Sequence, residues 1–177
     1  MGIIKGSISK WHVWRKYILI FVTVGSQQYQ FDRLIEELDR LVEDRVIKEK
    51  VFAQIGHSNY TPKNFDFVKF LDKEQYQKNI SQCDILVTHG GVGTIVSALK
   101  YGKKVIVVPR RQEFQEHIDD HQMQIAEVLL DQKLIQAVFD INELKGSYNE
   151  ILNGKEFEIY EANSHILDIV IGFIEKN

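Results

Sequence analysis

The chain of 177 residues has one cysteine, Cys83. A single cysteine excludes an internal disulfide and a cysteine-rich zinc site, and such scarcity suits a reducing compartment. No apolar run approaches the roughly 20 residues that a membrane-spanning helix needs. The formal net charge is only −3, so the charge does not favour nucleic acid, and we expect no nucleic-acid partner.

Several motifs of nucleotide and catalytic chemistry are missing as well. The sequence has neither the dinucleotide pattern G-x-G-x-x-G nor the Walker pattern G-x-x-x-x-G-K-[ST], which disfavours NAD and ATP as ligands. The serine elbow G-x-S-x-G is absent too. His117 and His121 have the four-residue spacing of metal ligands on one helical face. No third ligand lies close to them in sequence, so we expect no metal.

What the sequence does contain is an alternation of apolar, β-branched runs with segments of helical period. Strands are predicted at residues 18–24, 50–56, 66–70, 84–89, 103–109 and 134–139. Helices are predicted at residues 31–47, 72–83 (with Asp72 as N-cap), 92–102 (closed by Gly102), 117–131, 141–152 and 157–174. Continuous apolar strands separated by helices indicate a parallel sheet buried on both faces, hence a doubly wound, Rossmann-like α/β fold.

The start of the chain has basic residues before the apolar run 17–24 and so loosely resembles a signal peptide. That run is short and β-branched, and it leads into a glycine turn without a small-residue cleavage site. We interpret it as the first strand of a single domain, residues 17–177, which follows an N-terminal extension, residues 1–16. The length of the chain suits one domain with its own core.

Ligands of open parallel sheets bind beyond the carboxyl ends of the strands. There the segment HGGVGT, residues 89–94, ends one strand and opens a helix. Free N–H groups and the helix dipole favour an anion at such a place, and glycine lets a phosphate come close. A mononucleotide diphosphate therefore fits this loop, with a plain tight turn as the alternative. The loop after the first strand adds Thr23, Gly25 and Ser26 at the same edge.

A second polar segment, RRQEFQEHIDDHQ at residues 110–122, follows the fifth strand. Its Asp120 and Gln122 suit sugar hydroxyls. The alternative is an exposed, charge-rich helix start.

Three stretches together resemble the C-terminal domain of family 28 glycosyltransferases: FVTVGSQQYQFDRLIEELD, DILVTHGGVGTIVSALKYGKKVIVVPR and EHIDDHQMQIAEVL. More narrowly, the chain resembles the small catalytic subunit of split UDP-sugar transferases. The resemblance covers about residues 18–175 and implies the C-terminal, donor-binding half of a GT-B fold. It places the UDP diphosphate at His89, Gly90, Gly91, Gly93 and Thr94. It places the donor sugar near Glu116, His117, Asp120 and Gln122. Ser97 stands where peptidoglycan-forming relatives hold the ribose with a glutamate.

The activity implied by this resemblance is inverting transfer of a sugar (galactose, glucose, glucuronate or N-acetylglucosamine) from a UDP-sugar to a lipid-linked glycan, in capsule or exopolysaccharide synthesis. A membrane-associated partner subunit would bring the acceptor and the base, and would recruit this cytoplasmic chain to the membrane. The N–H groups of Gly90, Gly91 and Gly93 would stabilise the departing UDP without a metal. On this half His89 is the one candidate for a catalytic side chain, and a purely structural histidine is the alternative.

Two other functions stay open. A UDP-sugar epimerase shares the GT-B architecture but needs both halves in one chain. A non-catalytic module that binds nucleotide-sugar, or a scaffold, is the second alternative.

Overall fold

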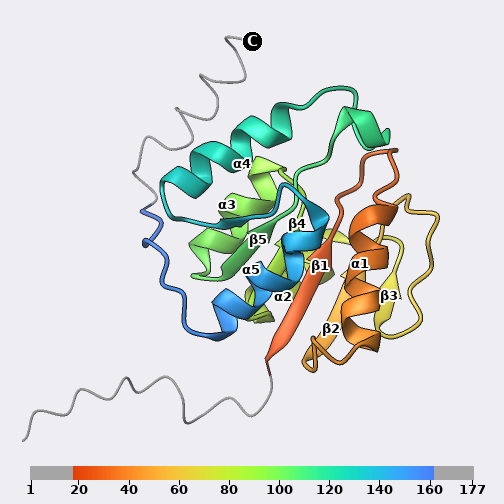
Figure 1. The fold of residues 1–177 in the computed structure, drawn as a ribbon, viewed down its shortest axis with the longest axis horizontal. Coiled ribbons are helices and arrows are strands. Elements are labelled where there is room, and N and C mark those ends of the chain that lie inside the picture. Colours follow the sequence, from red (N-terminus) through yellow and green to blue (C-terminus); the bar gives the residue numbers. More distant parts are fainter. Residues whose placement is uncertain (1–17, 162–177) are drawn as a thin grey trace, which may run out of the picture.

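The computed structural model describes residues 18–161, so the predicted extension, residues 1–16, lies outside the described residues. Within them one six-stranded sheet has the order β3-β2-β1-β4-β5-β6, and every neighbouring pair is parallel (Figure 1). The strands are β1 (Leu19–Thr23), β2 (Lys50–Gln54), β3 (Asp66–Val68), β4 (Ile85–Thr88), β5 (Lys104–Val107) and β6 (Gln136–Ala137). This order and direction confirm the predicted Rossmann-like, doubly wound fold.

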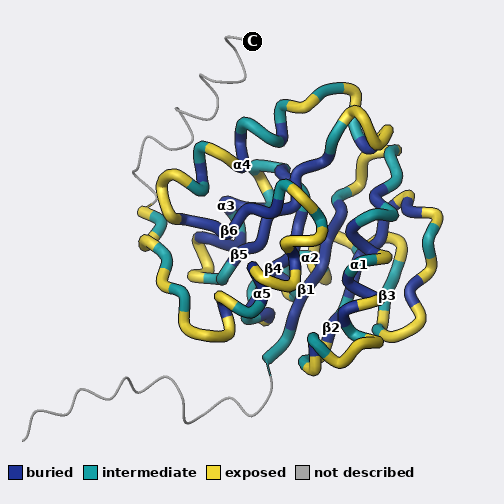
Figure 2. Tube along the Cα trace, in the orientation of Figure 1, coloured by how far each residue is buried: buried dark blue, intermediate teal, exposed yellow. Residues whose placement is uncertain are grey.

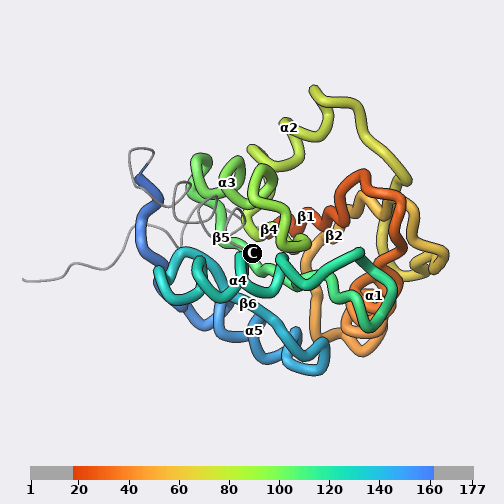
Figure 3. The backbone as a smooth tube through the Cα atoms, turned by 90° about the horizontal axis from the view of Figure 1, so that it is seen from above, coloured from red at the N-terminus to blue at the C-terminus, as the bar shows by residue number. Residues whose placement is uncertain are grey.

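Helices cover both faces of the sheet (Figure 3). One face packs against α1 (Asp32–Glu43) and α5 (Leu144–Leu152), the other against α2 (Lys73–Gln82), α3 (Val92–Lys100) and α4 (His121–Asp131). Successive side chains of a strand point to opposite faces. In β1, accordingly, Ile20 and Val22 join the first core and Phe21 joins the second. The strands are the most continuously buried part of the chain in Figure 2, as expected for a sheet enclosed between two helical layers.

Two predicted helix boundaries are confirmed. The side chain of Asp72 accepts a hydrogen bond from the backbone N–H of Gln75 (2.8 Å) and so caps α2. Gly102 follows α3 with φ of +65°, the left-handed conformation that ends many helices.

Three predicted helices differ from the structure. The periodicity predicts that the first reaches residue 47, but α1 ends at Glu43 because Arg45 adopts a φ of +58° and the N–H of Val46 returns to the carbonyl of Leu41 (2.9 Å). The helix predicted from residue 117 begins at His121. The last predicted helix does not begin at Phe157, because residues 157–161 are not helical and the N–H of Glu158 donates to the carbonyl of Lys133 (3.0 Å). Its remainder, residues 162–174, lies outside the described residues.

Among the strands, β6 is shorter than the predicted run 134–139 and β3 is shorter than the predicted run 66–70. Short 3₁₀ turns, which the periodicity does not predict, occur at η2 (Gln112–Phe114) and η3 (Ile141–Glu143). Within residues 18–161 no helix has the length and apolar character to cross a membrane.

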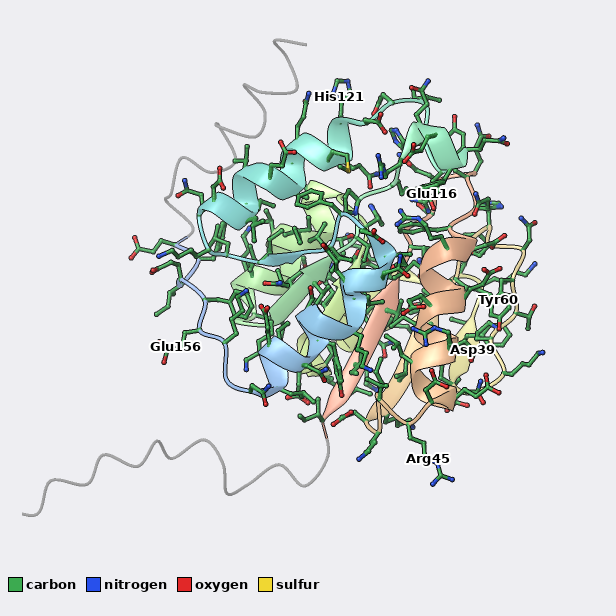
Figure 4. All side chains as sticks on the ribbon, in the orientation of Figure 1. Asp39, Arg45, Tyr60, Glu116, His121 and Glu156 are labelled. Carbon is green, nitrogen blue, oxygen red and sulfur yellow. The ribbon has the colours of Figure 1, made fainter. Side chains whose placement is uncertain are left out.

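A buried carboxylate fixes the loop after β2 to α1. Asp39 is 2% exposed and accepts hydrogen bonds from the hydroxyl of Tyr60 (2.7 Å) and from the N–H groups of Lys63 (3.0 Å) and Asn64 (2.8 Å). Figure 4 shows Asp39 and Tyr60 together on the flank of α1. Burial raises the pKa of Asp39, but the hydrogen bonds outweigh it and leave that pKa lowered, because they favour the charged form.

Candidate functional site

The strand order reverses between β1 and β4, so the loops that follow these two strands diverge to opposite faces of the sheet. Such a switch point, at the carboxyl ends of the strands, is where open α/β sheets bind ligands. Thr23 ends β1 opposite Thr88 of β4, and the Thr88 hydroxyl donates to the carbonyl of Thr23 (3.0 Å). The structure therefore places the start of the segment 89–94 next to the predicted residues of the first loop.

Two glycines of these loops make room for His89. A Cβ on Gly25 would lie 2.6 Å from Nε2 of His89, and a Cβ on Gly91 would lie 2.1 Å from its Cε1. Real Cβ atoms do not tolerate such distances, and Gly25 also has a φ of +78°, which favours glycine. The imidazole thus fits between the two loops only because both positions lack a side chain.

His89 is held as a neutral ring. Its Nδ1 accepts the N–H of Gly91 (2.8 Å), so the ring proton is assigned to Nε2. Burial, together with the nearby Arg110 and His117, lowers the pKa of His89 to about 3. At neutral pH the ring is therefore a hydrogen-bond donor of fixed tautomer, not a cation.

Gly90 makes room for a different neighbour, α4. A Cβ on Gly90 would lie 2.7 Å from Cβ of Gln122. The Gly90 N–H donates to Oε1 of Gln122 (2.9 Å), and the same oxygen accepts the N–H of Arg110 (3.1 Å). Two backbone donors on one oxygen fix the orientation of this amide. Only the NH₂ group of Gln122 remains for a ligand.

These contacts bear on the donor set predicted for the diphosphate, which stays a prediction. The N–H groups of Gly90 and Gly91 bind Gln122 and His89 in this structure. Within the segment HGGVGT, the backbone N–H groups of Val92, Gly93 and Thr94, in the first turn of α3, have no hydrogen-bond partner among the described residues. A Cβ on Gly93 would meet no atom within 4 Å. An anion on this segment would therefore first meet the N–H groups of this helix N-terminus.

The other residues predicted to bind the nucleotide differ in how far their hydroxyl groups are available to a ligand. The Thr94 hydroxyl lies 2.7 Å from the hydroxyl of Tyr76, and Ser97 Oγ donates to Oε1 of Gln77 (3.4 Å). Thr23 is fully buried, and its hydroxyl accepts the N–H of Gly25 (3.3 Å). Ser26 is exposed. Thr23 therefore stabilises the loop after β1 from inside the protein, whereas Ser26 is accessible at the surface of that loop.

Glu116 lies in an ion pair inside the protein. It is fully buried, and Arg33 binds it with Nε (3.0 Å) and Nη2 (2.9 Å). The N–H of Arg111 donates to the same carboxylate (3.1 Å). Figure 4 shows Glu116 at the end of the molecule where the strands finish. These partners hold the carboxylate toward α1, and its predicted contact with a donor sugar stays a prediction.

A hollow of about 570 Å³ lies on the α1 side of Glu116, away from the first turn of α3. It is lined by Gln30, Asp32, Arg33, Glu36, Glu37, Arg40, Asn59, Phe114, Glu116 and Ile141. Of the predicted site residues it includes Glu116 alone.

His117 and Asp120 remain nearer to solvent. Nδ1 of His117 lies 2.9 Å from Oδ1 of Asp119, and its ring lies 5.9 Å from that of Tyr29. Asp120 is exposed, and its Oδ1 accepts the N–H of Gln112 (2.9 Å). The hydrogen bond from the Gly90 N–H to Gln122 brings the second polar segment, residues 110–122, close to the glycine loop.

Two residues at this edge were not predicted from the sequence. Arg110 is 1% exposed and hydrogen-bonds the loop after β1, yet its position in the polar run PRRQEF suggests an exposed side chain. Phe70, which the apolar pattern places at the end of a strand, follows β3 and is 47% exposed, with its ring 5.1 Å from that of His57. No group of three or more His, Cys, Asp or Glu side chains that could hold a metal occurs in the part of the chain that the structure describes.

The fold is that of the Rossmann-like half of GT-B glycosyltransferases. The chain matches the glycosyltransferase family 28 C-terminal domain over residues 19–169 and belongs to that family.

Among curated relatives, the UDP-N-acetylglucosamine transferase subunit ALG13 of Debaryomyces hansenii is 21% identical over 146 residues, which cover 76% of this chain and 68% of the relative. The human protein of that name is 28% identical over 124 residues, which cover 62% of this chain and 10% of the human protein. The chain thus spans about two thirds of the first relative and a small part of the second.

Solved structures agree on the fold. The glycotransferase of kitacinnamycin superposes with a TM-score of 0.59 at 17% identity, over 99% of this chain and 44% of that one. A solution structure of ALG13 gives a TM-score of 0.59 at 15% identity, over 90% of this chain and 96% of that one. The first match corresponds to somewhat less than half of a glycosyltransferase, and the second to nearly a whole small subunit.

Proposed function

We propose that the chain is the donor-binding, catalytic subunit of a two-component inverting glycosyltransferase. It would transfer a sugar from a UDP-sugar to a lipid-linked glycan, together with a membrane-associated subunit that binds the acceptor. The observation that carries the proposal is the first turn of α3 at the switch point, where the N–H groups of Val92, Gly93 and Thr94 have no partner among the described residues and a Cβ on Gly93 would meet no atom within 4 Å. Two independent supports are membership of family 28 and the relatives named as UDP-N-acetylglucosamine transferase subunits.

In the reaction, the bond between the sugar C1 and the diphosphate oxygen breaks, and its electron pair stays on UDP. The acceptor hydroxyl oxygen forms the new bond to C1, and its proton passes to a base on the partner. The first turn of α3 would stabilise the charge that develops on UDP, because its N–H groups are oriented before the reaction. The Nε2–H of His89 adds a neutral donor beside them. No metal is needed in this scheme.

The other parts of the donor would lie along the same edge. The exposed ring of Phe70 offers a flat apolar surface for the uracil, since aromatic rings stack on bases. The NH₂ group of Gln122, His117 and Asp120 are the groups left for the sugar hydroxyls. N-acetylglucosamine is the sugar that the relatives' names favour. Galactose or glucuronate, in capsule or exopolysaccharide synthesis, are the other candidates. A cytoplasmic chain recruited to the membrane by its partner fits this scheme.

Calorimetric titration tests the proposal directly. The purified chain is titrated with UDP, then with UMP, and then with UDP-galactose, UDP-glucuronate and UDP-N-acetylglucosamine. We expect UDP to bind more tightly than UMP, because the second phosphate adds contacts at α3. Absence of UDP binding, alone or with the partner, would refute the proposal. UDP-sugar binding without turnover in the presence of the partner and acceptor would favour the alternative of a non-catalytic nucleotide-sugar-binding module.

A further inference from the structure

Arg110 is the largest of the fully buried side chains, and it carries a charge. Burying a charge is costly unless hydrogen bonds and opposite charges compensate it. Among the described residues, the carboxylate that acts on Arg110 is that of Glu116, which Arg33 binds with two nitrogens. The group of Arg33, Arg110 and Glu116 therefore holds two positive charges and one negative charge. Burial lowers the pKa of Arg110 to about 10, which still leaves it charged at neutral pH.

The guanidinium of Arg110 hydrogen-bonds main-chain carbonyls from two loops. In the loop after β1, Nη2 donates to Val24 (2.7 Å), and Nη1 donates to Tyr29 (3.2 Å) and Gln30 (2.9 Å). In the loop after β5, Nη1 donates to the carbonyl of Glu116 (3.0 Å). The guanidinium also lies over the ring of Phe31, 4.7 Å from its centre. It is thus fully enclosed by protein.

The backbone of Arg110 extends this connection to the glycine loop. Its N–H donates to Oε1 of Gln122, the oxygen that also accepts the N–H of Gly90. One residue therefore connects the loops after β1, β4 and β5. These loops carry Gly25, His89 and His117, and the charge of Arg110 acts on His89 between them.

We propose that Arg110 is the positioning residue of the donor site. It holds the loops after β1 and β5 at a fixed separation around His89, and it places an excess positive charge behind the diphosphate without touching it. This inference rests on the proposed function. It assigns the fixed geometry of the donor site to Arg110, a side chain that would not contact the donor.

The geometry of arginine matters here. The planar guanidinium spreads its donors over separate nitrogens, and here two of them reach four carbonyls on two loops. A lysine has three donors on a single nitrogen and cannot span the same acceptors. Misplacement of binding groups by about 1 Å can lower activity about 100-fold. We therefore expect the Kd for UDP to rise about 10-fold in Arg110→Lys and about 100-fold in Arg110→Met, as the loops separate.

The experiment compares wild type, Arg110→Lys, Arg110→Met and the control Arg40→Met. Arg40 is an exposed arginine of α1 that pairs with Glu37 and Asp44, so its replacement repeats the chemical change away from the site. UDP binding is measured by calorimetry below the thermal unfolding temperature of each variant. The expected result is weaker binding in both Arg110 variants and unchanged binding in Arg40→Met.

Chemical rescue separates positioning from general stability. In Arg110→Ala, millimolar guanidinium should fill the vacated space and restore part of the UDP affinity, whereas sodium chloride of equal ionic strength should not. This measurement also serves if Arg110→Met does not fold. Binding by folded Arg110→Lys within twofold of wild type, or the absence of any guanidinium-specific rescue, would overturn the inference. Failure of the wild type to bind UDP would instead overturn the proposed function, and this inference with it.

Discussion

Replacing Gly93 by alanine should stabilise the protein and weaken its binding of UDP. The two effects have separate causes, because Gly93 lies in the first turn of α3, where a Cβ would meet no protein atom within 4 Å. Alanine forms helix more readily than glycine by about 0.5–1 kcal/mol. For a chain of this length such a gain raises the unfolding temperature by roughly 1–4 °C.

The loss of binding follows from where the new methyl group would project. Side chains of a helix tilt toward its N-terminus, so the Cβ would enter the space in which a phosphate meets the N–H groups of Val92, Gly93 and Thr94. Hydrogen bonds to a charged acceptor contribute about 1.5–3 kcal/mol each. Loss of one of them corresponds to a Kd that is about 10- to 100-fold higher.

Gly146→Ala is the matched control. Gly146 also lies within a helix, α5, where an added Cβ would again meet no atom within 4 Å, and α5 packs on the face of the sheet opposite α3. Calorimetry with UDP and thermal unfolding are measured for wild type and both variants. We expect both variants to gain stability and Gly93→Ala alone to lose affinity. If Gly93→Ala bound UDP as wild type does, the diphosphate would not lie on this helix terminus.

Three further predictions concern stability and reactivity. The pKa of His89 in the folded protein, about 3, lies below its ordinary value near 6.5. The free energy of unfolding should therefore fall as the pH drops from 6.5 toward 3, by up to about 1.4 kcal/mol per pH unit. In urea titrations, His89→Gln should lose less of this free energy than wild type between pH 7 and pH 5. Burial raises the pKa of the Cys83 thiol to about 11. Iodoacetamide should therefore label Cys83 only in urea. Labelling of the native protein would refute the assignment of Cys83 to the core. Asp39→Asn should lower the free energy of unfolding in urea by about 1.5–3 kcal/mol at pH 7, because it weakens the hydrogen bonds to Tyr60 and its neighbours. Because the pKa of Asp39 is lowered, this difference between wild type and variant should shrink as the pH falls below about 4. An equal difference at pH 7 and below pH 4 would contradict the assignment of the effect to the charge of Asp39.

The sheet could be predicted because buried parallel strands leave a local signal. Each strand appears in the sequence as an apolar run, and the turn signals Asp72 and Gly102 act on residues next to them. The start of α4 could not be predicted in this way. Residues 117–120 have helix-compatible side chains, but their polar groups bond elsewhere: Asp120 accepts the N–H of Gln112, and Asp119 contacts His117. Such contacts compete with the helix and are not visible as a period.

The candidate site was predictable in place but not in detail. The segment HGGVGT lies at the switch point, as a strand followed by glycines and a helix suggests. Which N–H groups are free depends on Gln122, which is 32 residues away from Gly90. The burial of Arg110 depends on carbonyls up to 86 residues away. No local pattern encodes contacts of this range.

The glycines of the segment therefore have two purposes that the sequence alone could not separate. Gly90 and Gly91 serve the protein itself, because helix α4 and the ring of His89 occupy the space beside them. A Cβ on Gly93 would meet no atom within 4 Å, so the described residues give no steric reason for a glycine there. An anion site built from helix N–H groups and a neutral histidine, held in place by an enclosed guanidinium, would need no side chain to reorganise when the ligand arrives. Such a site can be complete on one half of an enzyme, which is the property that a donor-binding subunit requires before its partner brings the acceptor.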